Sequence, residues 1–291
     1  MYTDLHMHTI YSDGEFSPME LVALARTAGI STMAITDHNN LRGSKEAIAN
    51  NIYSDITIIP GVEFSAKAKP QINIHILGYN VDLNDPELNE LAEAYEQDAK
   101  NQVKSLLELL KSEYDIAFSD KQVEKVFSLP GNIGRPEVAK LCLEAGHATS
   151  IEDAFKRFLN PVKPRQAKKQ VNPTDEALIK YIIDAGGIPC LAHPGSLNKS
   201  IWELREYIKK LMTYGLQAIE VYHSKNPYHL TMELKKITDE YGLYASVGSD
   251  YHGPIVSPDV YLRRGINDNL NIEMISILDK FTEVKIYDKK S

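Results

Sequence analysis

The stretch Ile188-Pro189-Cys190-Leu191-Ala192-His193 places a histidine directly after a short apolar run. Such a run, preceded by two glycines, predicts a buried strand. Similar strands and amphipathic helices follow one another in both directions along the chain. We expect strands at residues 32–36, 56–59, 72–79, 218–222 and 243–247, and helices at 17–29, 174–185, 201–212 and 230–241. Strands separated by helices of this length indicate an α/β fold with a parallel sheet or a barrel.

The middle of the chain has a different pattern. Asp85-Pro86 begins a long helical pattern with apolar residues on one side from Leu88 to Leu110. Further helices are predicted at 119–126, 135–145 and 151–159, with almost no strand signal between 86 and 165. We therefore predict a helical insertion at 86–165, expected to cap the substrate, in a domain formed by residues 1–85 and 166–291. The apolar stripe of the long helix is more typical of internal packing than of a partner site.

Composition limits the class of protein. Lys and Arg number 32 and Asp and Glu number 40, which gives a net charge of -8 and disfavours general binding to a nucleic-acid backbone. The start of the chain does not resemble a signal peptide, and no run of about 18 apolar residues predicts a membrane span. Cys142 and Cys190 lie far apart and fit a reducing compartment. We expect a cytoplasmic protein with no membrane association and no obligate protein partner.

Nine histidine and carboxylate side chains form a pool of candidate metal ligands, most of them at the end of an apolar strand. They are His6, His8, Asp13, His38, Glu63, His75, His193, Asp250 and His252. In β/α barrels the loops that follow the strands converge on one face, so these side chains are expected to meet there. Asp13 could instead be a turn residue before Gly14, and His75 a core histidine.

Two spacings strengthen this prediction. His6 and His8, and likewise Asp250 and His252, are two residues apart, so in extended chain each pair points to one side. Nitrogen and carboxylate ligands without cysteine suit Zn²⁺, Mn²⁺ or Fe²⁺ in a catalytic site. Nine ligands suggest two or three ions, and clustered divalent ions suit phosphoester hydrolysis.

The motifs around these residues resemble those of the PHP (polymerase and histidinol phosphatase) superfamily. They are Asp4-Leu5-His6-Met7-His8, Ser12-Asp13-Gly14, Ile35-Thr36-Asp37-His38, Pro60-Gly61-Val62-Glu63, Ala192-His193-Pro194 and Gly248-Ser249-Asp250-Tyr251-His252. The resemblance implies a distorted seven-stranded β/α (TIM-like) barrel with a trinuclear metal centre. It also implies one ion at His6, His8 and Asp250, a second at His75 and His193 with Glu63 bridging, and a third at Asp13, His38 and His252.

Other motifs resemble the stand-alone PHP phosphoesterases, a subgroup that includes nucleoside 3',5'-bisphosphate phosphatases and 5'-to-3' exonucleases of short RNA. They are Pro60-Gly61-Val62-Glu63-Phe64-Ser65, His75-Ile76-Leu77-Gly78-Tyr79 and Gly134-Arg135-Pro136. After Arg-Pro the subgroup commonly has a histidine, whereas this chain has Glu137.

Several residues are candidates for contact with the substrate. Arg135, Lys163 and Arg165 could hold a second anionic group, although basic runs such as 163–169 are more often a solvated face and Arg135 could be a surface residue. His223 also follows a predicted strand and is either an acid or base on the substrate side or an ordinary loop histidine. Asp13 and Asp250 are expected to take part in catalysis, and Asp37 to fix the tautomer of an imidazole.

We therefore predict a metal-dependent phosphoesterase in which a metal-activated hydroxide attacks phosphorus. The expected substrate is a small phosphomonoester, with a nucleoside 3',5'-bisphosphate first. Short RNA, cleaved by 5'-to-3' exonuclease action, and histidinol phosphate are the alternatives within this enzyme class. An inert metal-binding regulatory module is the alternative outside it.

Overall fold

The structure is a computed structural model that describes residues 2–68, 72–165, 171–270, 272 and 275–283. The chain divides into two compact units, one of Met1–Glu90 with Pro173–Ser291 and one of Leu91–Asn172. The long helix α3 (Pro86–Tyr114) begins in the first unit and continues in the second. The predicted return to the first domain at residue 166, and the basic residues Lys168 and Lys169, lie outside the described residues.

The first unit contains two sheets. The smaller sheet is parallel and has the order β1 (Tyr2–Asp4), β2 (Ile30–Ala34) and β3 (Thr57–Ile59). The larger sheet has the order β4 (Gly61–Ala68), β5 (Ile72–Tyr79), β6 (Ile188–Leu191), β7 (Ala218–His223) and β8 (Tyr244–Gly248). Strand β5 is antiparallel to both neighbours, whereas β6, β7 and β8 are parallel.

The α/β class is confirmed, whereas the distorted seven-stranded barrel is not: the described residues form one sheet of three strands and one of five. Pro60 stands between β3 and β4, and because proline has no N–H it cannot continue the ladder of either strand. The sheets instead meet through isolated parallel bridges, Met7 to Tyr251 and His38 to Glu63. Irregular backbone at these two points frees the side chains of His6, His8 and His38 for the site.

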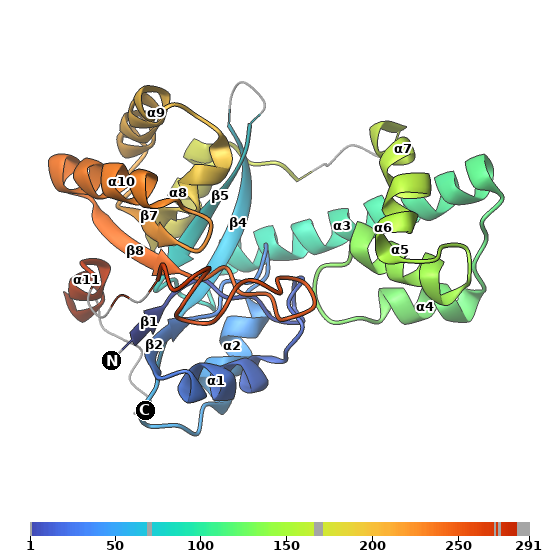
Figure 1. Ribbon diagram of the computed structural model, residues 1–291, viewed down its shortest axis with the longest axis horizontal. Coiled ribbons are helices and arrows are strands. Elements are labelled where there is room, and N and C mark those ends of the chain that lie inside the picture. The colour runs from blue at the N-terminus through green and yellow to red at the C-terminus, as the bar shows by residue number, and fades with distance from the viewer. Residues whose placement is uncertain (1, 69–71, 166–170, 271, 273–274, 284–291) are drawn as a thin grey trace. The chain divides into compact units, whose positions relative to one another are not determined.

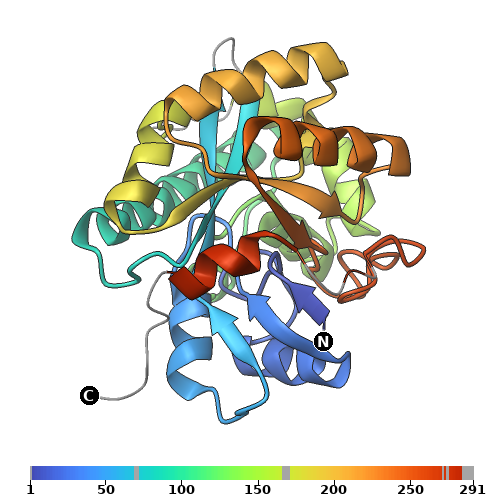
Figure 2. The same cartoon turned by 90° about the vertical axis from the view of Figure 1, so that its left-hand side faces the viewer.

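Helices cover the outer faces of both sheets (Figures 1 and 2). Helices α1 (Pro18–Thr27) and α2 (Arg42–Asn50) pack on each other beside the smaller sheet. Helices α8 (Asp175–Asp184) and α10 (Tyr228–Tyr241) pack on the larger sheet, and α9 (Ile201–Thr213) lies beside them. A short 3₁₀ helix, Pro194–Leu197, follows β6, and α11 (Ile277–Glu283) contacts β8. The elements thus alternate as the sequence predicted, and the strand ends remain uncovered by these helices.

The described part of the second unit is helical. After α3 come α4 (Asp120–Phe127), α5 (Arg135–Glu144), α6 (Ile151–Ala154), a π-helix (Phe155–Leu159), α7 (Asn160–Val162) and a 3₁₀ helix (Lys163–Arg165). Leu106 and Leu110 of α3 are fully buried in a core shared with Val138 and Phe158. The part of the apolar stripe from Val103 to Leu110 therefore packs inside the second unit. Over the described residues, each helix is too short or too polar to cross a membrane.

Candidate metal centre

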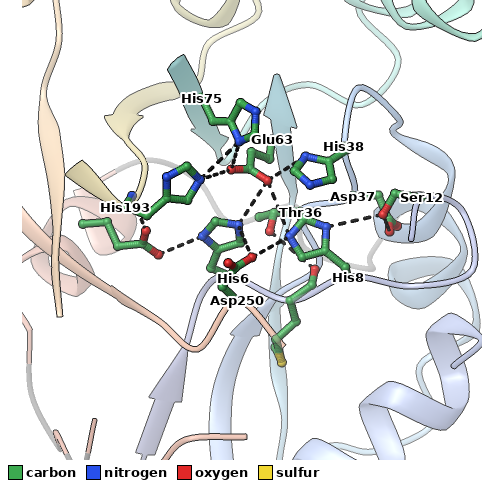
Figure 3. A network of polar contacts seen from close by, with 12 residues as sticks. His6, His8, Ser12, Thr36, Asp37, His38, Glu63, His75, His193 and Asp250 are labelled. Carbon is green, nitrogen blue, oxygen red and sulfur yellow. Dashed lines mark hydrogen bonds and ion pairs between the residues drawn. The ribbon is translucent and has the colours of Figure 1, made fainter. Parts of the chain in front are cut away.

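The nine predicted ligands come together in the first unit, mostly at strand ends. Figure 3 labels all of them except Asp13 and His252. His6 and His8 follow β1, His38 follows β2, and His193 follows β6, whereas Glu63 and His75 lie on β4 and β5. Asp250 and His252 follow β8. Their side chains form one continuous network of short polar contacts, and Asp13 joins it from the loop between β1 and α1.

Glu63 lies at the centre of this network and is completely buried. Its Oε1 atom is 2.9 Å from His75 Nδ1 and 2.8 Å from His193 Nε2. Its Oε2 atom is 2.8 Å from His38 Nδ1 and 3.2 Å from His6 Nε2. Because each oxygen faces a different pair of imidazoles, the Glu63 carboxylate is placed to bridge two cations.

Four groups of side chains have ligand atoms within 4.8 Å of one another, which is close enough to share an ion. They are His8, Asp13, His38 and His252; His6, His8 and Glu63; His38, Glu63 and His75; and His6, His223 and Asp250. The grouping differs from the family-based allocation: His38 joins Glu63 and His75, Glu63 and not Asp250 joins His6 and His8, His223 joins His6 and Asp250, and His193 is in none of the four groups. The pool of ligand types agrees with the sequence prediction, but its division among ions does not follow from sequence.

Glu220 is a residue of this site that the sequence reasoning missed. It lies on β7, is fully buried, and has its Oε1 atom 2.8 Å from His6 Nδ1. Its Oε2 atom accepts the backbone N–H of His193 at 2.6 Å. Gly248 makes room for it, because a Cβ there would lie 2.3 Å from Glu220 Oε1. The signal was a single carboxylate inside the apolar run Ala218–Tyr222, since a charge there needs a buried partner.

Two other histidines also have a hydrogen-bond acceptor beside Nδ1, the ring nitrogen that is not turned toward the cluster. His252 Nδ1 is 2.8 Å from the backbone oxygen of Asp250. His193 Nδ1 is 2.9 Å from the hydroxyl of Ser196, which donates its own proton to the backbone oxygen of His193. These partners require a proton on Nδ1, so they leave the Nε2 lone pair of each ring facing the cluster. Metal-binding histidines in proteins are usually oriented in this way.

Asp37 is linked to the cluster through Thr9 and Ser12. Its carboxylate accepts the backbone N–H and the hydroxyl of Thr9, each at 2.7 Å, and the hydroxyl of Ser12 at 2.7 Å. The Ser12 oxygen in turn lies 3.3 Å from His8 Nδ1. Asp37 therefore acts on the His8 imidazole through the Ser12 hydroxyl and not by direct contact. Burial raises the pKa of Asp37 to about 6, although its hydrogen bonds to Thr9 and Ser12 act in the opposite direction.

The electrostatics of the cluster favour cations. Burial would lower the pKa of His6, but the carboxylates of Glu220, Glu63 and Asp250 raise it well above its ordinary value. Burial would raise the pKa of Glu63, but the surrounding imidazoles hold it well below its ordinary value. A set of carboxylates that draws a proton to a buried imidazole draws a divalent ion for the same reason. Burial and two neighbouring imidazoles lower the pKa of His8 to about 3, which keeps this ring neutral as a ligand must be.

Unpartnered atoms show that this donor set fits metal ions. His6 Nε2, His8 Nε2 and Glu63 Oε2 are buried and have no hydrogen-bond partner among the described residues. A buried polar atom without a partner costs about 1–3 kcal/mol, so three of them in contact require a ligand. Divalent transition metals take this combination of imidazole and carboxylate.

Two of the predicted ligands adopt left-handed backbone conformations. The φ angle is 57° at Asp250 and 25° at His193. Such conformations cost non-glycine residues free energy and are concentrated at functional sites. Hydrogen bonds hold both residues in place: Asp250 N–H donates to His6 O at 2.8 Å, and His193 N–H donates to Glu220.

His223 differs from the other histidines in its hydrogen bonding. Its Nδ1 atom accepts the backbone N–H of Lys225 at 3.2 Å, so the neutral ring carries its proton on Nε2. That nitrogen is buried, has no hydrogen-bond partner among the described residues, and lies 3.5 Å from Asp250 Oδ2. The distance would allow a metal contact, but the tautomer makes His223 a proton donor.

The predicted substrate-binding residues Arg135, Lys163 and Arg165 all lie in the second unit and are described within it. Arg165 Nη1 is 2.5 Å from Glu113 Oε2. Arg135 Nη2 donates to Asn160 Oδ1 at 2.7 Å. Arg135 Nε is buried and has no hydrogen-bond partner in the described part of the chain, so this side chain retains a free donor.

Glu137, which stands where the resembling subgroup commonly has histidine, has a local role. Its Oε2 atom accepts the backbone N–H of Gly134 at 2.6 Å, at the N-terminus of α5. A carboxylate in the first turn of a helix stabilises the helix by this bond and by its interaction with the helix dipole.

A cavity of about 370 Å³ opens beside the metal cluster within the first unit. One part of its wall consists of cluster side chains, together with His223. The rest consists of Gly195, Ser196, Lys225 and Asn226. The candidate ligands thus face a space large enough for a small molecule.

Comparison with known proteins identifies the class. The PHP domain family matches residues 4–244, and the chain belongs to this family. It is accordingly a metal-dependent phosphoesterase, a hydrolase of phosphate esters, and the family predicted from the motifs is confirmed.

Individual relatives carry different names. The chain is 30% identical over 254 residues to the 5'-3' exoribonuclease Rnm of Escherichia coli, covering 86% of this chain and 85% of the relative. It is 28% identical over 251 residues to the 3',5'-nucleoside bisphosphate phosphatase of Chromobacterium violaceum, covering 86% and 87%. A solved structure from Bifidobacterium adolescentis, described as a predicted metal-dependent phosphoesterase, superposes with a TM-score of 0.73 at 25% identity, covering 97% and 94%.

Proposed function

We propose that this protein hydrolyses a small phosphomonoester, with a nucleoside 3',5'-bisphosphate as its preferred substrate. The observation that carries the proposal is the group of buried, unpartnered ligand atoms around Glu63 beside a cavity of about 370 Å³. A cavity of this size suits one nucleotide, because small-molecule sites range from roughly 300 to 1,000 Å³. The 28% identity to a bisphosphate phosphatase over most of both chains supports the substrate class.

Two or three divalent ions, Mn²⁺, Fe²⁺ or Zn²⁺, would be held by the three groups of ligands that do not include His223. When bound, such ions lower the pKa of water and stabilise negative charge on the oxygens around phosphorus. Within the chain, Glu63 would join neighbouring ions, and Asp13 would complete the group of His8, His38 and His252. Glu220 would orient His6 by keeping its proton on Nδ1.

His223 would supply the proton that the leaving alkoxide needs. Its Nε2–H faces the cavity side of Asp250, and the Lys225 N–H on Nδ1 keeps the proton there. Asp250 would have two tasks, because its Oδ1 atom lies 3.5 Å from His6 and 3.3 Å from His8, whereas its Oδ2 atom lies near His223. One oxygen would serve the ions and the other would orient the proton donor.

Arg135, Lys163 and Arg165 remain proposed contacts for a second anionic group. Arg135 has the best support, because its guanidinium keeps an unused Nε–H. Arg165 would have to exchange Glu113 for the substrate.

A second candidate function is 5'-to-3' hydrolysis of short RNA, which the 30% identity to an exoribonuclease favours. The net charge of -8 favours the small molecule, since RNA binding depends on cations that neutralise several phosphates. Histidinol phosphate stays a hypothesis from the superfamily. The reading as an inert metal-binding module does not hold, because the family consists of enzymes.

The test is phosphate release by Mn²⁺-loaded protein from adenosine 3',5'-bisphosphate, histidinol phosphate and a short 5'-phosphorylated RNA. We expect the highest kcat/KM for the bisphosphate. A higher value for the RNA would transfer the assignment to the exonuclease. Activity on histidinol phosphate alone would refute both nucleotide assignments.

A further inference from the structure

Lys225 and Asn226, in the turn directly after His223, line the cavity and belong to none of the candidate ligand groups. Of the described residues that line the cavity, Lys225 is the only lysine or arginine. Its Nζ atom lies 3.2 Å from Asp250 Oδ2, and its side chain is 61% exposed. An ammonium group has three donors, so one contact to Asp250 leaves two available for a ligand.

The next residue, Asn226, has an unsatisfied acceptor in this wall. Asn226 is only 4% exposed, and its Nδ2 atom donates to the backbone oxygen of Val221 at 3.1 Å. Its Oδ1 atom has no hydrogen-bond partner among the described residues. That oxygen lies against Gly195, where a Cβ would come within 2.6 Å of it. One of the two Nδ2 hydrogens is used, whereas Oδ1 has no partner at all, so Oδ1 is the atom of Asn226 that most needs a donor from a ligand.

Hydrogen bonds hold the backbone of this turn, which fixes the position of Asn226 and the point from which the Lys225 side chain extends. Asn226 N–H donates to the backbone oxygen of His223 at 2.9 Å, and Lys225 N–H donates to its ring. From outside the turn, Asn269 Nδ2 donates to the backbone oxygen of Ser224 at 2.7 Å. A site whose donors and acceptors are fixed in advance loses less entropy on binding.

We propose that Lys225 and Asn226 form a subsite that binds the non-reacting phosphate of the substrate and one sugar hydroxyl. The proposal rests on the proposed function and defines its substrate more closely. In a nucleoside 3',5'-bisphosphate both the 3' and 5' oxygens carry phosphate, so the 2'-hydroxyl is the one free hydroxyl of the ribose. Lys225 supplies the charge for the second phosphate, and Asn226 Oδ1 accepts the 2'-hydroxyl proton. The subsite therefore selects a ribonucleotide over its 2'-deoxy counterpart.

Asp250 explains how Lys225 becomes available for an anion. Without cations its carboxylate is the partner nearest to Lys225. Asp250, with His6 and His8 beside its Oδ1 atom, would share its charge with a bound cation, which would leave the Lys225 ammonium freer to contact the substrate. Recognition of the second phosphate is then strongest in the metal-loaded protein.

The first test compares native protein with Lys225→Met on adenosine 3',5'-bisphosphate and adenosine 5'-monophosphate. We expect kcat/KM to fall about 10- to 100-fold for the bisphosphate, the range for a hydrogen bond to a charged group, and much less for the monophosphate. Lys225→Arg should restore most of the loss. Lys236→Met is the matched control, because that lysine is 63% exposed and lies on α10. Equal losses on both substrates would overturn the role of Lys225.

The second test measures kcat/KM of the native protein for adenosine 3',5'-bisphosphate and its 2'-deoxy form. We expect a preference for the ribonucleotide of about tenfold or more, which Asn226→Ala should abolish. Equal rates of the native protein on both would overturn the role of Asn226, even if the variant does not fold. If the native protein ignores the bisphosphate but hydrolyses another phosphomonoester, the proposed function fails and this subsite fails with it. If it hydrolyses the bisphosphate without either selectivity, only the subsite fails.

Discussion

Replacing Glu220 by glutamine should weaken metal binding without touching any ligand. The native carboxylate accepts from two sides, from His193 N–H at 2.6 Å and from His6 Nδ1 at 2.8 Å. An amide has one acceptor and one donor, and the backbone N–H of His193 can only donate. The amide nitrogen must therefore face His6 Nδ1 and move the ring proton to Nε2, the atom that a cation needs.

The expected loss follows from this change of tautomer. Removing a hydrogen-bond partner of a metal-binding histidine usually costs 10- to 100-fold in affinity, which is about 1.4–2.7 kcal/mol. Glu220 holds two such residues, His6 through its ring and His193 through its backbone, so we expect a value near the upper end. The loss should appear in the tightest ion, since His6 belongs to two of the ligand groups.

The assay is calorimetric titration of metal-free protein with Mn²⁺, together with elemental analysis of the loaded protein. Glu206→Gln is the control, because it makes the same chemical change in an exposed ion pair with Lys209. Circular dichroism establishes that each variant is folded. If Glu220→Gln bound the same number of ions with an affinity within about twofold of the native protein, the tautomer argument would be refuted.

Four further outcomes are expected. His223→Gln should lower kcat by about 10²- to 10⁴-fold with an unchanged number of bound ions, whereas loss of an ion would make it a ligand. Arg135→Ala should raise KM more for adenosine 3',5'-bisphosphate than for the monophosphate, and equal effects would contradict a contact with the second phosphate. Chelation should lower Tm, because ions that bind only the folded protein stabilise it, and an unchanged Tm would contradict this. Burial raises the pKa of the Cys142 thiol to about 11 from 9.0, so the unfolded chain ionises first and native protein should lose stability between pH 9 and 11. Urea unfolding of Cys142→Ala should show a smaller loss over the same range, and parallel curves would contradict this account.

The helices were predictable where local signals mark their ends. Ser17 and Glu20 form the predicted capping box of α1, and Ser119 with Gln122 forms that of α4. Helix α2 was not predicted because its N-terminal residue, Leu41, has no side chain that caps the backbone. Strand β1 has only three residues, and its pairing with β2 joins positions about 28 apart, which local patterns do not reveal.

The arrangement of the strands was less predictable than their existence. The strands at 61–68 and 72–79 follow each other with no helix between them, which is typical of a hairpin, and β4 and β5 are antiparallel. A chain that contains such a hairpin among its strands and helices does not have to form one continuous parallel sheet. The backbone hydrogen bond from Leu5 N–H to Val247 O, 3.0 Å long, joins the residue after β1 to β8, which is far away in the sequence, and no local pattern encodes it.

The ligands were predictable because they stand at strand ends, whereas the groups that orient them were not. A residue that follows a strand can be recognised from the sequence, because the apolar run before it marks the strand. The tautomer of an imidazole depends on which atom faces its second nitrogen, and that atom belongs to a distant segment: Glu220 for His6, and Ser12 for His8. Only the structure shows that His223 faces a donor rather than an acceptor, and this single contact separates a proton donor from a ligand.

One turn carries both His223, the proposed proton donor, and Lys225, the proposed contact for the substrate. The backbone N–H of Lys225 fixes the proton of His223, while its side chain offers charge to the substrate. Replacing the Lys225 side chain leaves its backbone N–H in place, so the two tasks can be separated by mutation even though one residue performs both. A change of substrate in this fold therefore needs no change in the metal cluster, because the residues that select the substrate lie beside the ligands and not among them.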